Sequence, residues 1–310
     1  MKAAQISEYG HADAVKVVEV EQPKITRGQV LVEVQAASLN PFDTMVREGY
    51  LKERIPLDLP VTIGGDIAGV VREVSEDVEN VAVGDVVYGQ ANVVAGNSGA
   101  FAEYAATKAV QVAKAPSGLD ITEAASLPLI GVSAIQALTE HLKLAAGQKI
   151  FIHGGAGAIG SIAIEIAKNI GAYVATTATG AGIALVKELG ADEVIDYKST
   201  KFSETLSDYD AIFDTVGGED FAKSLSILKK SGVAVSMVAQ SAEVKAKELE
   251  VTAINQMTQV TTEKLKALAK LVEDGIVKPR VGKIFPISEI QAAFEARESG
   301  AVQGKIIVHL

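Results

Sequence analysis

The sequence contains no cysteine among its 310 residues. This absence excludes disulfide bonds, thiolate ligands for a metal ion and a cysteine nucleophile. The four histidines are too few, and too far apart in the sequence, to predict a histidine-rich metal centre; they are His11, His141, His153 and His309. Aromatic residues make up only 5% of the chain, so we expect aliphatic side chains to form most of the core.

Basic residues are scarce relative to acidic ones, with 29 Lys and Arg against 39 Asp and Glu and a formal net charge of -10 at pH 7. Such a surface repels nucleic acid and anionic membranes, so we predict neither as a partner. The longest apolar stretch, residues 159–171, carries Glu165 and Lys168 and therefore does not predict a membrane span. The first ten residues lack the apolar core of a signal peptide. We therefore expect a cytoplasmic protein.

Hydrophobic residues make up 48% of the chain and charged residues 22%, which is typical of a globular protein with a sizeable core. The region from Met1 to about Pro116 contains short β-rich runs separated by Gly, Pro and Asp. These runs predict a compact and mostly antiparallel β domain. They are residues 15–23, 29–38, 67–75, 85–90 and 102–116.

After Gly118 the pattern changes to alternating helices and strands. Asp120 followed by Glu123 is typical of a helix capping box. The predicted strands are residues 149–154, 172–177, 193–196, 210–216 and 232–239, and the predicted helices between them are residues 158–171, 182–190 and 220–228. This alternation predicts a parallel sheet with helices on both faces, in which residues 231–239 form the last strand. A further helix, 262–275, precedes β-rich segments that we expect to return to the first domain. The predicted domains are therefore residues 1–120 with 260–310, and residues 121–259.

The clearest motif is Gly155-Ala156-Gly157-Ala158-Ile159-Gly160, which has the spacing G-x-G-x-x-G. A predicted buried strand precedes it and a predicted amphipathic helix begins inside it, which is the context of a dinucleotide-binding turn. We expect the first glycine to permit the tight turn and the second to let the backbone approach a pyrophosphate. The third would bring the helix close to the strand. The alternative is a tight turn that binds no ligand.

The end of the second predicted strand indicates which dinucleotide is bound. NAD sites usually place a carboxylate there to bind the ribose, but residues 175–180 contain none. No carboxylate would then repel a 2′-phosphate, and the hydroxyls of Thr176, Thr177 and Thr179 could bind one. The sequence therefore favours NADPH, chiefly because a residue is missing.

In their order along the whole chain, several motifs resemble the medium-chain dehydrogenase/reductase superfamily, and within it the quinone oxidoreductase (zeta-crystallin-like) family. The motifs are residues 38–43, 64–69 and 127–134, the glycine turn, residues 214–218, and Gly304-Lys305. The resemblance implies an α/β protein with a GroES-like β-rich catalytic domain plus a Rossmann domain with a doubly wound parallel sheet.

The chain departs from the zinc alcohol dehydrogenases of this superfamily. Those enzymes carry a Gly-His-Glu motif where this chain has Gly64-Gly65-Asp66, and a four-cysteine lobe where residues 90–99 are short and cysteine-free. Without a Lewis acid to stabilise an alkoxide, alcohol oxidation is disfavoured. We expect Asp66 to be a structural carboxylate.

The family resemblance implies roles for individual residues. Asn40 would lie beside the nicotinamide and the substrate and could donate to a developing oxyanion, or it could be a turn residue before Pro41. Asp43 follows it in the motif and could cap a helix through residues 44–49. Tyr50 would be an aromatic residue near the substrate, or a surface tyrosine. The other implied cofactor contacts are Ser133, Tyr197, Val216, Gly217, Val238 and Lys305, although Lys305 is most simply a solvated lysine.

The leading hypothesis is an NADPH-dependent reductase of quinones or other α,β-unsaturated carbonyls that uses no zinc. One alternative is an NADPH-binding sensor or structural protein with little turnover, because no irreplaceable catalytic group can be named. A zinc alcohol dehydrogenase is a more distant alternative. Related proteins pair the edge strands of their Rossmann sheets, so we also expect a homodimer.

Overall fold

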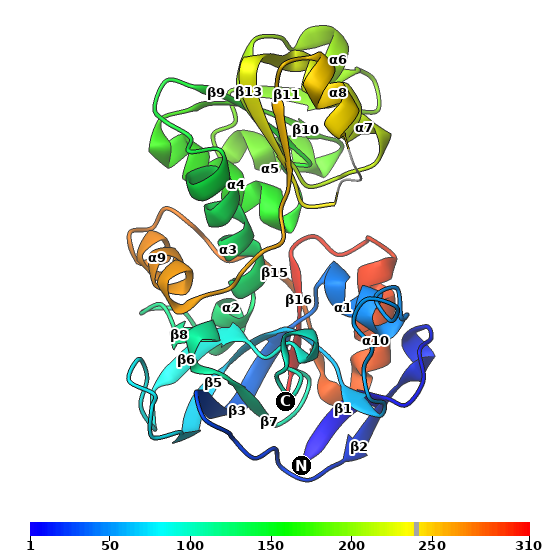
Figure 1. Cartoon of the computed structure of the whole chain (residues 1–310), viewed down its shortest axis with the longest axis vertical. Coiled ribbons are helices and arrows are strands. Elements are labelled where there is room, and N and C mark those ends of the chain that lie inside the picture. Colours follow the sequence, from blue (N-terminus) through cyan, green and yellow to red (C-terminus); the bar gives the residue numbers. More distant parts are fainter. Residues whose placement is uncertain (239–241) are drawn as a thin grey trace. The chain divides into compact units, whose positions relative to one another are not determined.

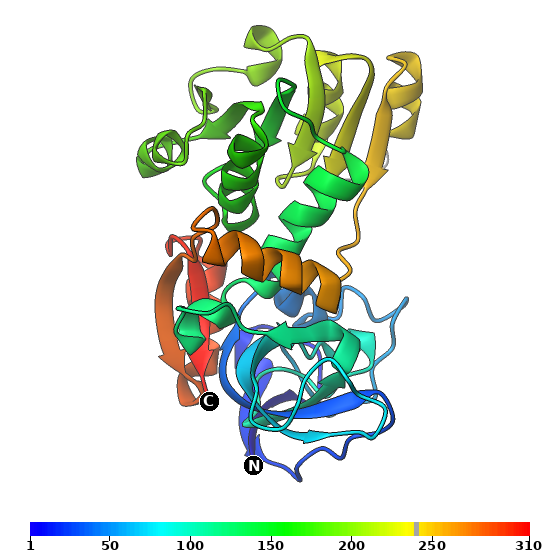
Figure 2. The ribbon, with the colours of Figure 1, turned by 90° about the vertical axis from the view of Figure 1, so that its left-hand side faces the viewer.

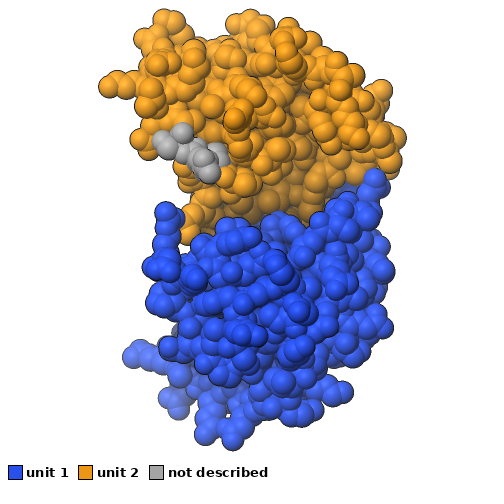
Figure 3. Space-filling model, turned by 90° about the vertical axis from the view of Figure 1, so that its right-hand side faces the viewer, with its two compact units in different colours: residues 1–129, 260–273, 279–310 blue, residues 130–259, 274–278 orange. Residues whose placement is uncertain are grey.

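The computed structural model describes residues 1–238 and 242–310 and divides the chain into two compact units (Figure 1, Figure 3). Unit 1 comprises residues 1–129, 260–273 and 279–310, and unit 2 comprises residues 130–259 and 274–278. The first boundary follows Leu129 instead of residue 120, because helix α2 (Ile121–Ala125) packs on the sheet of unit 1. The last residue of the predicted strand 232–239 lies outside the described residues.

Unit 1 is built on a seven-stranded sheet. Its strands, in spatial order, are β15 (Val281–Pro286), β16 (Lys305–His309), β3 (Gln29–Ser38), β5 (Asp66–Val74), β6 (Val86–Gln90) and β8 (Val112–Lys114), and β7 (Tyr104–Lys108) also pairs with β3. All of these pairs are antiparallel except β15 with β16. The predicted antiparallel β domain is therefore present, and the C-terminal strand β16 completes it.

A smaller antiparallel sheet and four helices complete unit 1. The sheet has the order β2 (Val15–Glu19), β1 (Lys2–Ile6), β4 (Val61–Thr62). The helices are α1 (Pro41–Arg47), α2, α9 (Thr262–Glu273) and α10 (Ile290–Glu298). The capping box predicted at the start of α2 is confirmed, since Asp120 accepts the Glu123 backbone N–H at 2.8 Å and Glu123 accepts that of Asp120 at 3.1 Å.

Helix α10 contributes a large aromatic side chain to the core of unit 1. Phe294 is fully buried and meets Phe101 edge-on, with ring centroids 6.1 Å apart. The guanidinium of Arg47, also fully buried, lies 4.9 Å from the centre of the Phe294 ring. Its charge is balanced because it donates to Glu298 at 2.7 Å and to Glu48 at 2.6 Å. Helices α1 and α10 are thus fixed to each other.

Unit 2 is built on a six-stranded parallel sheet. Its strands, in spatial order, are β11 (Glu193–Asp196), β10 (Tyr173–Ala178), β9 (Lys149–His153), β12 (Tyr209–Asp214), β13 (Leu228–Ser236) and β14 (Thr252–Asn255). The helices are α3 (Pro128–Ile135), which continues as a π-helical turn over Gln136–His141, α4 (Ala158–Ile170), α5 (Ala181–Glu188), α6 (Phe202–Thr205), α7 (Glu219–Ser224) and α8 (Glu243–Glu248). Helices cover both faces of the sheet (Figure 2).

The strand order reverses between β9 and β12. The chain runs outward from β9 through β10 to β11 and then returns to the other side of β9 at β12. Ligands of doubly wound sheets bind outside the carboxyl ends of the strands at such a reversal. The prediction that residues 231–239 form the last strand was wrong, because β14 lies beyond β13. Its four residues, of which only Ala253 and Ile254 are partly buried, were too short and too polar to detect.

The packing of Phe294 predicts a measurable stability effect. Replacing Phe294 by alanine leaves a cavity beneath Phe101 and Arg47, and we expect unit 1 to lose ~3–5 kcal/mol of unfolding free energy. Denaturant unfolding followed by hydrogen exchange in unit 1 measures this loss. The control is Val110→Ala in the same unit, because Val110 is 65% exposed and should change stability little. Equal stabilities of the two variants would contradict the packing described above.

Candidate functional site

The glycine turn joins β9 to α4 at the reversal point of the unit 2 sheet. The residue with positive φ is Gly154, at +84°, and not Gly155. A Cβ on Gly155 would instead lie 2.1 Å from Thr176 Oγ1, so this glycine is required by the close approach of β10. The expected reason for Gly155 was therefore wrong, because the turn is made one residue earlier.

The second and third glycines of the motif differ in how crowded they are. A Cβ on Gly160 would lie 2.3 Å from the Gly154 carbonyl oxygen, so α4 can approach the turn only with glycine at this position. A Cβ on Gly157 would meet only that same oxygen, at 3.2 Å. Gly157 is the N-cap of α4 and provides no capping side chain. The backbone N–H groups of Ala158, Ile159 and Gly160 in the first turn are thus suited to an anionic group.

The threonines at the end of β10 do not all face a ligand. Thr176 is fully buried and donates to the Ile152 carbonyl at 2.6 Å, and the buried Thr177 hydroxyl accepts the Gly154 N–H at 3.0 Å. The prediction that Thr176 binds a phosphate is corrected, because its hydroxyl donates to β9 instead. Thr177 holds the glycine turn against β10 as an acceptor and keeps its own hydroxyl proton, so its contact with a phosphate stays a prediction. Thr179 is partly buried, and Tyr197, which follows β11, is 55% exposed. These two remain candidates.

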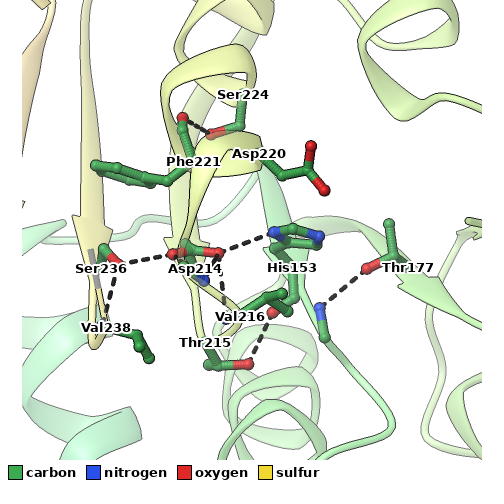
Figure 4. Close-up of polar contacts among 12 residues, drawn as sticks. His153, Thr177, Asp214, Thr215, Val216, Asp220, Phe221, Ser224, Ser236 and Val238 are labelled. Atoms are coloured by element: carbon green, nitrogen blue, oxygen red, sulfur yellow. Dashed lines mark hydrogen bonds and ion pairs between the residues drawn. The ribbon is translucent and has the colours of Figure 1, made fainter. Parts of the chain in front are cut away.

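A buried polar cluster connects β9, β12 and β13 (Figure 4). The Asp214 carboxylate accepts from Ser236 Oγ at 2.6 Å and is 2.8 Å from His153 Nδ1. The aspartate lies between the other two, so the serine hydroxyl does not face the imidazole and the group is not a nucleophilic triad. Burial raises the pKa of Asp214, but the hydrogen bonds from His153, Ser236 and the Gly217 N–H outweigh it and hold the pKa below its usual value.

This cluster shapes the loop after β12. Asp214 accepts the N–H groups of Val216 and Gly217, and Thr215 donates to the His153 carbonyl at 2.8 Å. The loop thereby presents Val216, which is 50% exposed (Figure 4). Val238, after β13, is 57% exposed and packs over Gly217, where a Cβ would lie 2.8 Å from Val238 Cβ. Two apolar side chains are therefore exposed at the carboxyl edge of the sheet.

Ser133 on α3 belongs to a separate group of polar residues in unit 2. It is buried, and its hydroxyl lies 2.7 Å from Thr258 Oγ1. Its carbonyl accepts from Gln256 Nε2 at 3.0 Å. These contacts join α3 to the segment after β14, which also ends at the carboxyl edge of the sheet.

In unit 1, Asn40 is held at both ends of its side chain. Its Oδ1 accepts from Lys305 Nζ at 2.6 Å, and its Nδ2 donates to Asp66 Oδ2 at 2.9 Å. Lys305 also donates to the Leu39 carbonyl at 2.8 Å and is only 5% exposed, so the expectation of a solvated lysine was wrong. Asn40 is the N-cap of α1, and its amide joins α1 to β5 and β16. We name this chain of contacts the Lys305–Asn40–Asp66 bridge.

The fully buried Asp66 carboxylate is satisfied from several sides. Gln90 Nε2, opposite it on β6, donates at 3.0 Å, and the Leu129 N–H donates at 3.3 Å. Burial raises the pKa of Asp66, against the opposing effect of the Lys305 charge, and burial lowers the pKa of Lys305. Asp66 is thus the structural carboxylate that we expected.

Asp43 is a second buried carboxyl group beside this bridge. Its Oδ2 accepts the Asn40 backbone N–H at 2.7 Å, as expected for a residue in the first turn of α1. Burial raises its pKa from 3.8 to about 7; the charge of Asp66 adds to this, while the Asn40 hydrogen bond, Lys305 and Arg297 oppose it. Asp43 therefore holds its proton up to near-neutral pH.

Tyr50 lies just after α1 and is 69% exposed. Its hydroxyl, with the contributions of His11 and Arg47, lowers the pKa of Glu48 to about 2, although burial acts in the opposite direction. An aromatic residue at this position is available to a ligand, but no described contact directs it toward one.

The chain matches two known domain families. Residues 26–117 match the alcohol dehydrogenase GroES-like domain, and residues 189–308 match the zinc-binding dehydrogenase family. The chain is 34% identical, over 320 residues, to 2-methylene-furan-3-one reductase of Solanum lycopersicum and also to NADPH-dependent alkenal/one oxidoreductase, chloroplastic, of Arabidopsis thaliana. Each alignment covers 100% of this chain and 79% of the relative.

Among solved structures, the quinone oxidoreductase from Coxiella burnetii is 34% identical, with a TM-score of 0.92, covering 100% of this chain and 99% of that one. The chain belongs to the quinone oxidoreductase family of medium-chain dehydrogenases/reductases. The predicted family and the predicted combination of a GroES-like domain with a Rossmann domain are confirmed. Within residues 1–238 and 242–310, no three His, Asp or Glu residues are grouped as a metal site would require. None of the helices in this part is long and apolar enough to cross a membrane.

Sequence reasoning missed several of the contacts that shape the candidate site. His153, Asp214 and Ser236 are far apart in the sequence and meet only because β9, β12 and β13 are adjacent and in register. Gln90 could have been found, because a buried carboxylate on β5 requires a donor from the neighbouring strand. Asp43 belongs to a motif that the sequence shows, but its burial cannot be inferred from the sequence.

The unequal crowding of the glycines predicts different outcomes for two matched variants. Gly160→Ala places a Cβ 2.3 Å from a backbone oxygen and should strongly destabilise unit 2, whereas Gly157→Ala, whose Cβ would lie 3.2 Å from that oxygen, should destabilise it much less. If the open approach at Gly157 serves a pyrophosphate, Gly157→Ala should weaken NADPH binding by about tenfold or more, as expected for losing ~1.4 kcal/mol of contact. Thermal unfolding and calorimetric titration with NADPH measure the two effects. Equal destabilisation by both variants would contradict the geometry.

The raised pKa of Asp43 predicts how stability depends on pH. The folded protein holds this proton to about pH 7, but the unfolded chain releases it near pH 4. The contribution of Asp43 is therefore fully present below pH 4 and is lost as pH rises through about 7, at up to ~1.4 kcal/mol for each pH unit. Asp43→Asn cannot titrate, so its stability relative to the wild type should rise over this range and then level off. Urea unfolding at several pH values measures the difference, and a pH-independent difference would exclude the shift.

Proposed function

We propose that this protein is an NADPH-dependent oxidoreductase that transfers a hydride to a quinone or another α,β-unsaturated carbonyl compound without zinc. One observation carries the proposal. A glycine turn opens α4 at the reversal point of the sheet, and no carboxylate stands at the end of the neighbouring strand β10. Asp196 on the next strand pairs with Ala178, and its Oδ1 accepts the Lys198 N–H at 3.1 Å, so this carboxylate is engaged in its own turn.

The residues present fit such a dinucleotide. Gly157 and the first turn of α4, with Ala156, would bind the pyrophosphate through backbone N–H groups. Thr179 and Tyr197 would lie toward the ribose phosphate. The exposed Val216 and Val238, together with Gly217, would contact the dinucleotide along the carboxyl edge, and Ser133 would approach its nicotinamide end. NADPH supplies a hydride when bound, and the side chains named here would hold it in place.

We propose that unit 1 provides the residues around the substrate. Asn40 carries neither a thiol nor an imidazole, and Gly65 stands where zinc-dependent members of the superfamily have a histidine, so this donor set favours chemistry without zinc. Quinones and enones are already electrophilic, and their reduction needs only hydrogen bonding to the oxygen that becomes negative. Because the Lys305–Asn40–Asp66 bridge engages both ends of the Asn40 amide, we propose that Asn40 acts mainly by fixing the start of α1.

We also propose a cytoplasmic homodimer. The strand β14 ends the unit 2 sheet, and its outer edge is suited to pairing with the same strand of a second copy. Its Thr252 and Asn255 are exposed.

A matched oxidation assay tests the function. NADPH and NADH are supplied in turn with simple quinones and with α,β-unsaturated aldehydes and ketones. We expect turnover with NADPH and a clear preference for it over NADH, because no carboxylate at the end of β10 repels the 2′-phosphate. A preference for NADH would contradict the proposed binding of the 2′-phosphate, but the protein would still be a reductase. Tight NADPH binding without turnover of any acceptor would favour a sensor or structural role instead.

A further inference from the structure

Three polar side chains converge on the α-carbon of Gly65 in unit 1. A Cβ built on this residue would have as its nearest neighbours Asp43 Oδ1 at 3.5 Å, Asn92 Nδ2 at 3.7 Å and Gln90 Nε2 at 3.9 Å. These are ordinary van der Waals distances, so there is room here for one further atom. The φ angle of Gly65 is not positive, so its backbone does not require glycine. We call the space bounded by these four residues the Gly65 site.

The Asn92 side chain is oriented so that it donates into this space. Its Oδ1 accepts the Val94 N–H at 2.9 Å and caps the short 3₁₀ turn Val93–Ala95. This contact fixes the oxygen of the amide and leaves Nδ2 on the side of Gly65. No described residue accepts a hydrogen bond from Nδ2, and Asn92 is only partly buried. An N–H donor is therefore directed at the site.

Asp43 provides a second polar atom. Its Oδ2 is used by the Asn40 N–H, whereas no described residue hydrogen-bonds to its Oδ1. In the described part of the chain, two side-chain polar atoms are shielded from solvent and lack a hydrogen-bond partner, namely Thr44 Oγ1 and Gln256 Oε1. Oδ1 of the buried Asp43 also lacks a partner but is not one of these shielded atoms, so it borders accessible space. When this carboxyl is protonated, its hydrogen belongs on Oδ1, because Oδ2 already accepts a hydrogen bond.

We propose that the Gly65 site binds the carbonyl oxygen of the acceptor through hydrogen bonds from Asn92 Nδ2 and the Asp43 carboxyl group. This inference rests on the proposed reduction of quinones or enones and adds the residues that touch the substrate. Two donors at the oxygen stabilise the negative charge that develops there, as in other oxyanion sites. Gln90 donates to Asp66 and lines the site as a positioning residue.

The test measures binding without turnover. 1,4-Naphthoquinone is titrated into the complex of the full chain with NADP⁺, which cannot supply a hydride. The chain has no cysteine, so no thiol adds to the quinone. Affinity is followed by difference absorbance, and the carbonyl stretch of the bound quinone by infrared difference spectroscopy. Hydrogen bonding to one oxygen should lower the frequency of that stretch in the wild type.

Two variants alter the site and should still fold. Gly65→Ala fills the space at van der Waals distances, and Asn92→Ser keeps an oxygen that can cap Val94 but removes Nδ2. Each should weaken binding by about tenfold, as expected from losing a hydrogen bond of ~1 kcal/mol or more. Gly65→Ala, whose methyl group faces both donors, should abolish the infrared shift, and Asn92→Ser, which leaves the Asp43 donor, should reduce it. Asn97→Ser is the matched control, because Asn97 contacts Gln111 and Lys108 instead. NADP⁺ affinity should be the same in all of them.

The role of Asp43 is tested by pH. The charged groups that act on it are Asp66 on β5, Lys305 on β16 and Arg297 on α10. Quinone affinity should fall as pH rises through about 7, where Asp43 loses its proton, and Asp43→Asn should remove this dependence.

Wild-type affinity and an unchanged infrared shift in Gly65→Ala and Asn92→Ser would overturn the proposed site, while wild-type turnover of quinones with NADPH would leave the proposed function standing. If the wild type neither binds the quinone nor reduces any acceptor, both proposals fail.

Discussion

The Lys305–Asn40–Asp66 bridge is the interaction on which the arrangement of unit 1 depends. It joins a strand near the C-terminus, the start of α1 and a central strand. Burying an ammonium and a carboxylate is costly unless both are paired and hydrogen-bonded. Here the Asn40 amide accepts a hydrogen bond from Lys305 and donates one to Asp66. The amide therefore connects the two charged groups, which are not in direct contact with each other. The first 129 residues would leave Asp66 without this compensation, which gives a physical reason for the chain to return to unit 1 after residue 259.

In unit 2, the main constraint is that the backbone of the glycine turn must approach a ligand closely, with no side chain between them. Gly155 and Gly160 are required by β10 and by the turn itself, whereas a Cβ on Gly157 would meet only the Gly154 carbonyl oxygen, at 3.2 Å. The hydroxyls of Thr176 and Thr177 maintain this geometry from β10. On the other side of β9, the cluster of His153, Asp214 and Ser236 fixes the loop that presents Val216. The polar side chains with structural roles are thus buried behind the carboxyl edge of the unit 2 sheet, whereas apolar side chains and backbone groups are exposed at this edge.

Much of this fold could be predicted because its signals are local. The strand, glycine turn and helix around residues 149–171, and the capping box at Asp120, depend on neighbours a few residues away. The strand β14 was missed because it has only four residues, two exposed and two partly buried, and therefore shows no periodicity. The burial of Lys305 was missed because its partner is Asn40, far away in the sequence. The contact of Thr176 with β9 could not be predicted, because sequence shows that a hydroxyl is present but not which carbonyl or N–H it contacts. Turns and caps depend on residues that are close in the sequence, whereas the pairing of buried charged groups depends on segments that are far apart in it.

The charge balance of unit 1 explains why a carboxyl group can keep its proton beside a substrate. Asp66 and Lys305 offset each other's charge through Asn40, so ionising Asp43 would add an uncompensated negative charge to a buried region. Arg297 opposes this only partly, because its charge has the smallest effect among the groups that lower the pKa of Asp43. The neutral form of Asp43 is therefore favoured, and a neutral carboxyl is both a hydrogen-bond donor and free of repulsion toward an oxygen that becomes negative. If Asp43 were ionised, its carboxylate would repel the same oxygen. The burial that keeps Asp43 neutral therefore also makes it suitable for this position.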